Sequence, residues 1–161
     1  RALTDALRRF ANGRPICLVQ LPRAPMGGTD GFGAELLPDC RAIQRAIDTL
    51  THRVPIVQVA AGRPLYKFTG LEVDLTNETR VPQLLDVAAE ADGALGYVRF
   101  MLPLCESLGK PLLLVWSRRG LRSGTGYVRQ ITPAKVIHRA DLVRSICDDE
   151  EIEGVADGFL R

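Results

Sequence analysis

The sequence predicts one α/β domain, a Rossmann-like doubly wound parallel sheet of about five to six strands with helices on both faces. Three observations predict this fold: a length of 161 residues of which 46% are hydrophobic, short and almost wholly apolar segments, and amphipathic segments that alternate with them. The length suits a single domain, and no apolar run approaches the roughly 18 residues that a membrane span needs. The sequence therefore predicts a compact domain without a membrane span.

The first half of the chain predicts two helices and three strands. Leu3, Leu7 and Phe10 recur at helical spacing, and Gly13 follows as a stop, which predicts a helix over residues 2–12. A second helix begins near Pro38 or Asp39, after a long loop that is rich in glycine and proline. The three predicted strands are the apolar runs 16–21, 54–60 and 71–75.

The second half continues the alternation. A helix capped by Thr79, with Pro82 in its first turn, leads to a strand over 94–98. Another helix runs to a stop at Gly109, before the wholly apolar strand 111–116. One or two short strands are predicted within Tyr127–Ile131 and Lys135–His138, and a last helix over 140–147. The domain is thus expected to span 1–147, and 148–161 to be an acidic, weakly ordered tail outside the core.

Charge and cysteine content exclude several classes of protein. The net charge of +2 is too small for a field that attracts nucleic acid, so no nucleic-acid partner is expected. The four cysteines lack metal-binding spacing, so no zinc site is expected, and they read as reduced thiols of a cytoplasmic protein. The basic residues are 18 arginines against 3 lysines, which fits either a GC-rich genome or contacts to phosphate and carboxylate groups.

Ligands of such sheets bind beyond the carboxyl ends of the strands, so the loops at that edge matter most. Arg118, Arg119 and Arg122 lie in a glycine-rich loop after the strand 111–116. Three guanidiniums among flexible glycines could hold a diphosphate, and a solvated basic loop is the alternative.

Two further positions at this edge are candidates for anion binding. Arg23 and the turn of Gly27, Gly28 and Thr29 follow the first strand, although the glycines do not fit a dinucleotide fingerprint and ordinary loop structure is the alternative. Arg99 lies where a strand meets a helix N-terminus, a place that favours anions. It could bind an anion there or form an ion pair with Glu106.

Three segments carry a resemblance to a known family. They are Val73-Asp74-Leu75-Thr76, the helix Leu84 to Asp92, and Ser107-Leu108-Gly109-Lys110-Pro111-Leu112. In this order they resemble the C-terminal half of a GT-B glycosyltransferase, most closely glycosyltransferase family 9, the ADP-heptose:lipopolysaccharide heptosyltransferases. The resemblance covers residues 14 to 147.

The resemblance implies that this domain binds a nucleotide-sugar donor, without a metal or other cofactor. An acceptor-binding domain upstream of Arg1 would supply the catalytic base, so no catalytic residue is assigned and the isolated chain is not expected to complete transfer. Basic side chains and a helix N-terminus would balance the charge of the donor phosphates. The predicted donor-binding residues are Arg23, Gly27, Gly28, Thr29, Arg99, Arg118, Arg119 and Arg122.

The chain departs from the family in its donor motif. The family carries an Asp-Ser-Gly-x-x-His segment that holds the donor phosphates, and the matching positions here are Val98 to Pro103, which keep none of its polar residues. Two alternatives follow: an interaction or structural module that keeps the fold without catalysis, and a regulatory domain that binds nucleoside phosphates.

Overall fold

The computed structural model describes residues 1–22, 36–59, 62–63, 65–123, 126 and 128–161, and its strands form one parallel sheet. The strand order β3-β2-β1-β4-β5-β6 is that of a doubly wound sheet, which confirms the predicted fold class. The strands are β1 (Cys17–Val19), β2 (Ile56–Gln58), β3 (Val73–Asp74), β4 (Gly93–Gly96), β5 (Leu112–Trp116) and β6 (Val143–Cys147). Within these described ranges no helix is both long and apolar enough to cross a membrane.

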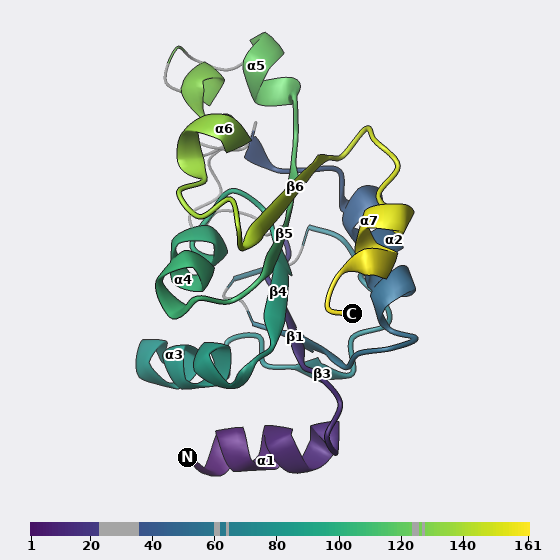
Figure 1. The fold of residues 1–161 in the computed structure, drawn as a ribbon, viewed down its shortest axis with the longest axis vertical. Coiled ribbons are helices and arrows are strands. Elements are labelled where there is room, and N and C mark those ends of the chain that lie inside the picture. The colour runs from purple at the N-terminus through teal and green to yellow at the C-terminus, as the bar shows by residue number, and fades with distance from the viewer. Residues whose placement is uncertain (23–35, 60–61, 64, 124–125, 127) are drawn as a thin grey trace.

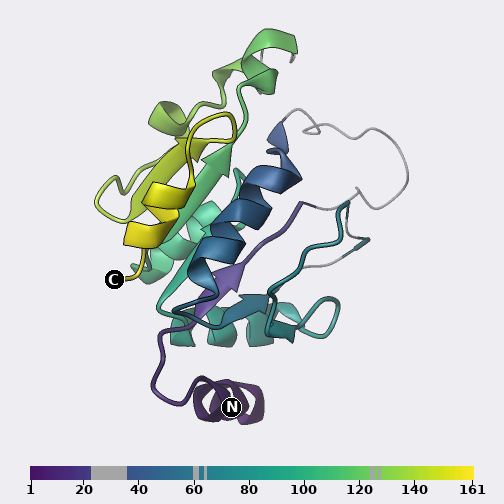
Figure 2. The same ribbon diagram turned by 90° about the vertical axis from the view of Figure 1, so that its right-hand side faces the viewer.

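Helices cover both faces of this sheet (Figure 1). On one face lie α1 (Ala2–Ala11), α3 (Val81–Glu90) and α4 (Met101–Leu108), and on the other lie α2 (Cys40–Leu50) and α7 (Glu153–Gly158). Turning the molecule by 90° places α2 and α7 in front of the sheet (Figure 2). Each face has its own apolar core. Leu18 and Leu112 belong to the core on the α1, α3 and α4 face, and Leu95 and Leu113 belong to the core on the α2 and α7 face.

The helix ends follow largely from local sequence. Asp39 is the N-cap of α2, and its side chain accepts a hydrogen bond of 2.9 Å from the Arg41 amide. Gly109 ends α4 with a positive φ of 67°, as its lack of a side chain allows. The N-cap of α3 is Arg80 instead of the expected Thr79, because the Gln83 side chain accepts a hydrogen bond of 2.9 Å from the Arg80 amide.

The predictions for residues 127–147 are wrong in the part that the structure describes. Two short helices, η2 (Val128–Gln130) and α6 (Pro133–Val136), replace the expected strands, and Tyr127 lies outside the described residues. The expected helix 140–147 is instead the edge strand β6, paired in parallel with β5 from Leu112↔Val143 to Trp116↔Cys147. Val143, Ile146 and Cys147 have helical spacing, but pairing with β5 also buries all three.

Three residues of the segment after β6 are buried in the core, contrary to the expectation that 148–161 lies outside it. Ile152, Ala156 and Phe159 are buried in the core of the α2 face, and α7 packs against α2. The Nη2 of Arg53 donates to the carbonyl oxygens of Ala156, Asp157 and Phe159 at 3.2, 2.8 and 2.9 Å. These three residues lie in the last turn of α7 and just after it, where a cation compensates the exposed carbonyls. The acidic residues of this segment lie at the surface. Its acidic composition therefore gives no sign that it also has a buried apolar face.

Candidate functional site

A cavity of about 620 Å³ lies at the carboxyl ends of β5 and β6, beside the N-terminus of α2. This is the edge of the sheet where ligands of doubly wound folds bind. The predicted residues Arg118, Arg119 and Arg122 line it together. The other lining residues are Pro22, Leu37, Pro38, Asp39, Cys40, Leu65, Ser117, Asp148 and Asp149.

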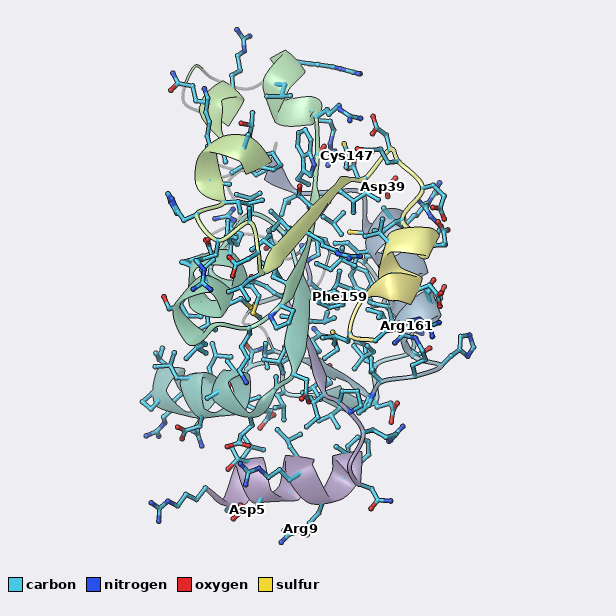
Figure 3. The ribbon with its side chains drawn as sticks, in the orientation of Figure 1. Asp5, Arg9, Asp39, Cys147, Phe159 and Arg161 are labelled. Carbon is cyan, nitrogen blue, oxygen red and sulfur yellow. The ribbon has the colours of Figure 1, made fainter. Side chains whose placement is uncertain are left out.

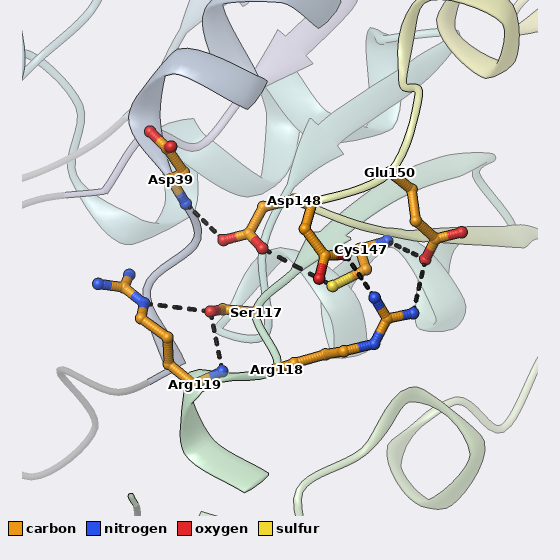
Figure 4. A network of polar contacts seen from close by, with 8 residues as sticks. Asp39, Ser117, Arg118, Arg119, Cys147, Asp148 and Glu150 are labelled. Carbon is orange, nitrogen blue, oxygen red and sulfur yellow. Dashed lines mark hydrogen bonds and ion pairs between the residues drawn. The ribbon is translucent and has the colours of Figure 1, made fainter. Parts of the chain in front are cut away.

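The helix α5 (Arg119–Ser123) begins three residues after the end of β5 and carries two of the three arginines. The Oγ of Ser117 accepts hydrogen bonds from the amide and the Nε of Arg119, both at 3.2 Å (Figure 4). The Nη2 of Arg119 also donates to the carbonyl oxygen of Leu37, which precedes α2. The Arg119 side chain therefore extends from the end of β5 toward the N-terminus of α2. Arg122 follows one turn later, and its side chain is exposed.

Arg118 faces the loop that follows β6. Its Nη1 pairs with Asp149 and its Nη2 with the Oε1 of Glu150 at 3.0 Å, while the guanidinium lies 5.4 Å from the centre of the Trp116 ring. The hydrogen bond to Asp149 raises the pKa of Arg118. Two carboxylates thus already balance the charge of the arginine that was expected to hold a diphosphate.

The same loop reaches the N-terminus of α2. The Oδ2 of Asp148 accepts a hydrogen bond of 2.7 Å from the Asp39 amide, and its Oδ1 lies 3.7 Å from the Cys147 thiol (Figure 4). The Cys147 amide donates to Glu150 at 3.2 Å. Figure 3 shows Asp39 and Cys147 near each other in the upper part of the molecule, although α2 and β6 are far apart in sequence.

One group among the described residues offers ligand atoms with the spacing of a metal site. The atoms come from Cys147, Asp148 and Asp149 and lie within 4.8 Å of one another. Asp149 is already paired with Arg118, and Asp148 with the Asp39 amide. These carboxylates therefore have hydrogen-bond donors in the fold itself, and their geometry does not call for a cation.

Arg99 lies apart from the other arginines. It lines a second cavity, of about 410 Å³, with Leu102 and Glu106 of α4 and with His138. Glu106 does not take Arg99 as its hydrogen-bond partner: its Oε2 accepts from the amides of His138 at 2.7 Å and Arg139 at 2.5 Å. Arg99 is thus an exposed cation at a separate cavity.

Residues 98–103, which stand where the expected donor motif would be, include the first turn of α4. The amide of Met101, the first residue of α4, donates to the Oε1 of Gln20 at 3.1 Å. Gln20 directly follows β1, so a side chain beside the neighbouring strand already takes up this amide. The remaining predicted binding residues, Arg23, Gly27, Gly28 and Thr29, lie outside the residues that the structure describes.

The acidic side of the cavity lies outside the residues predicted to bind the donor. Asp148 and Asp149 belong to the segment predicted to be a tail, and Ser117 is not among the predicted binding residues. Their position in the chain could have indicated them, because Ser117 directly follows β5 and Asp148 directly follows β6. The predicted helix over 140–147 gave no reason to place residue 148 at the carboxyl edge of the sheet, whereas a strand there does.

Comparison of the chain with models of known families, with curated proteins and with solved structures found no match. What the chain binds is therefore inferred from its own residues.

Proposed function

We propose that the chain is a nucleotide-sugar-binding domain of a glycosyltransferase, acting with an acceptor-binding domain, and that the donor binds in the cavity at the carboxyl ends of β5 and β6. The observation that carries this proposal is the mixed lining of the cavity. Arg119 and Arg122 line the same cavity as Asp39, Asp148 and Asp149. Guanidiniums suit phosphate oxygens, and carboxylates accept hydrogen bonds from sugar hydroxyls.

Size and place support the same proposal. A cavity of about 620 Å³ is in the range of sites for small molecules and cofactors, roughly 300–1,000 Å³. It lies at the end of α2 that carries the positive end of the helix dipole, where a phosphate is stabilised. A ligand with both phosphates and hydroxyls would use both halves of the lining.

The proposal is tested by thermal unfolding with a panel of nucleoside diphosphates and their sugars. A true donor at 100 times its Kd stabilises the fold by about 2.7 kcal/mol, which raises Tm by several degrees. The variant Arg119→Ala/Arg122→Ala should lose this shift. Arg9→Ala should keep it, because Arg9 is exposed on α1 at the opposite end of the molecule from Asp39 and Cys147 (Figure 3). No shift with any nucleotide at millimolar concentration would contradict the proposal.

A second candidate is an interaction or structural module without catalysis. Two observations favour it: Arg118 is already balanced by Asp149 and Glu150, and the Met101 amide is already bonded to Gln20. The same panel separates the two candidates, since a module of this kind gains no stability from nucleotides.

A further inference from the structure

The acidic loop, residues Asp148–Glu150, occupies the groups that would bind a phosphate. The Asp148 carboxylate accepts a hydrogen bond of 2.7 Å from the Asp39 amide, at the N-terminus of α2. Asp149 and Glu150 pair with the two terminal nitrogens of Arg118. A helix N-terminus and a bidentate guanidinium are groups that bind phosphates in proteins, and here both are bonded to carboxylates.

We propose that the acidic loop is an internal substitute for the phosphates of the ligand, an autoinhibitory contact that a diphosphate must displace to reach Arg118. This inference rests on the proposed function, because it takes the cavity to be the anion site. It explains why Asp149 and Glu150 both pair with Arg118 at the cavity. Without a ligand, Asp149 and Glu150 balance the charge of Arg118. With a ligand, they would leave Arg118.

The contacts of the loop are of a kind that a diphosphate can displace. The side chains of Arg118, Asp149 and Glu150 are 39%, 51% and 49% exposed, so water and salt screen both ion pairs. Exposed ion pairs of this kind are weak. A diphosphate carries more charge than either carboxylate and can bind a guanidinium through two oxygens, so it competes well for the same nitrogens.

The fold keeps the competitor close to Arg118. On one side of the acidic loop, β6 pairs with β5 along its whole length. On the other side, Ile152 is buried and α7 packs against α2. Anchoring at both ends gives the carboxylates a high effective concentration at Arg118, so they return when the ligand leaves.

The test is the affinity of the whole chain for inorganic pyrophosphate, measured by titration calorimetry. Asp149→Asn/Glu150→Gln should bind pyrophosphate about tenfold more tightly than the unsubstituted chain, because the internal competitor loses its charge. The control Glu90→Gln/Asp141→Asn changes the net charge equally and also breaks two arginine ion pairs, Arg8–Glu90 and Arg139–Asp141, outside the cavity. It should bind as the unsubstituted chain does. Adding Arg118→Ala to the first variant should remove the gain.

The outcomes separate this inference from the proposed function. Equal affinity of the unsubstituted chain and Asp149→Asn/Glu150→Gln, an equal gain in the control, or no pyrophosphate binding in any variant would overturn the inference. If the unsubstituted chain binds a nucleotide sugar but the variant gains nothing, only the inference fails. If the variant gains affinity for pyrophosphate through Arg118 while no protein binds a nucleotide sugar, the inference stands and the proposed function fails.

Discussion

At the scale of single residues, Asp149 shows how a surface carboxyl is tuned by its neighbours. Hydrogen bonds from the Cys147 thiol and from Arg118 lower the pKa of Asp149. Both donors come from the ends of paired strands, because Cys147 is the last residue of β6 and Arg118 lies two residues beyond β5. The ionised carboxylate is therefore the form that the folded state favours.

The lowered pKa predicts how the ion pair contributes to stability as pH changes. Its contribution is complete above the ordinary Asp value of 3.8 and is lost as pH falls through the lower value of the folded state. Asp149→Asn should thus lower the urea midpoint of unfolding at neutral pH, and the difference from the unsubstituted chain should shrink below pH 3.8. A difference that stays constant down to pH 2 would contradict this. Added salt should shrink it as well, since the pair is exposed.

Among the secondary-structure elements, α7 is a short helix that buries an apolar face against the core and leaves its acidic residues at the surface. Ile152 is fully buried at its N-terminus, and Arg53 bonds to carbonyls at its C-terminus. An isolated helix of six residues would not be stable in water. Its stability comes from packing on α2, which also holds the acidic loop in place.

Truncating Ile152 measures this packing. Ile152→Ala should lower the free energy of unfolding by about 2–5 kcal/mol, the cost of removing a buried aliphatic side chain and leaving a cavity. Urea denaturation at constant m-value gives the number. Leu85→Ala is the control, because Leu85 on α3 is 42% exposed and should change stability by at most about 0.5 kcal/mol. An Ile152→Ala effect as small as the control would mean that α7 does not dock on the core.

At the scale of the whole molecule, two apolar layers enclose the sheet and bury a thiol on each side. Cys17 lies in the core of the α2 face and Cys105 in the core of the opposite face. Burial is the main cause that raises the pKa of both thiols to about 12. Cys17 and Cys105 are therefore protonated at neutral pH and shielded from reagents.

Chemical labelling of the buried cysteines should report the unfolding of the whole domain. In the native state at pH 8, iodoacetamide should leave Cys17 and Cys105 unmodified, because the thiolate is the reactive form. Both should react fully in urea. Cys40, which is half-buried and lines the cavity, should react faster than either. Peptide mass spectrometry identifies the labelled positions, and native labelling of Cys17 at the rate of Cys40 would contradict the burial of this layer.

The apolar runs and the ends of α2 and α4 could be predicted because they depend on neighbouring residues. A strand buried on both faces reads as apolar, as in Leu112–Trp116, and Asp39 or Gly109 marks a helix end by its own backbone chemistry. Residues 143–147 could not be assigned in this way. Their apolar spacing fits a helix and an edge strand equally, and the choice depends on the open edge of β5, about 30 residues earlier.

The fold class, most of the strands and the cluster of arginines after β5 could be predicted from the order of the residues alone. What those arginines face became clear only once the strands were paired in three dimensions. The register that pairs Trp116 with Cys147 places the residues after β5 beside those after β6, so Arg118 meets Asp149 and Glu150. Helix caps and burial patterns depend on interactions over a few residues of sequence. The balance of charge in the cavity depends instead on which strand ends lie next to each other in the folded sheet.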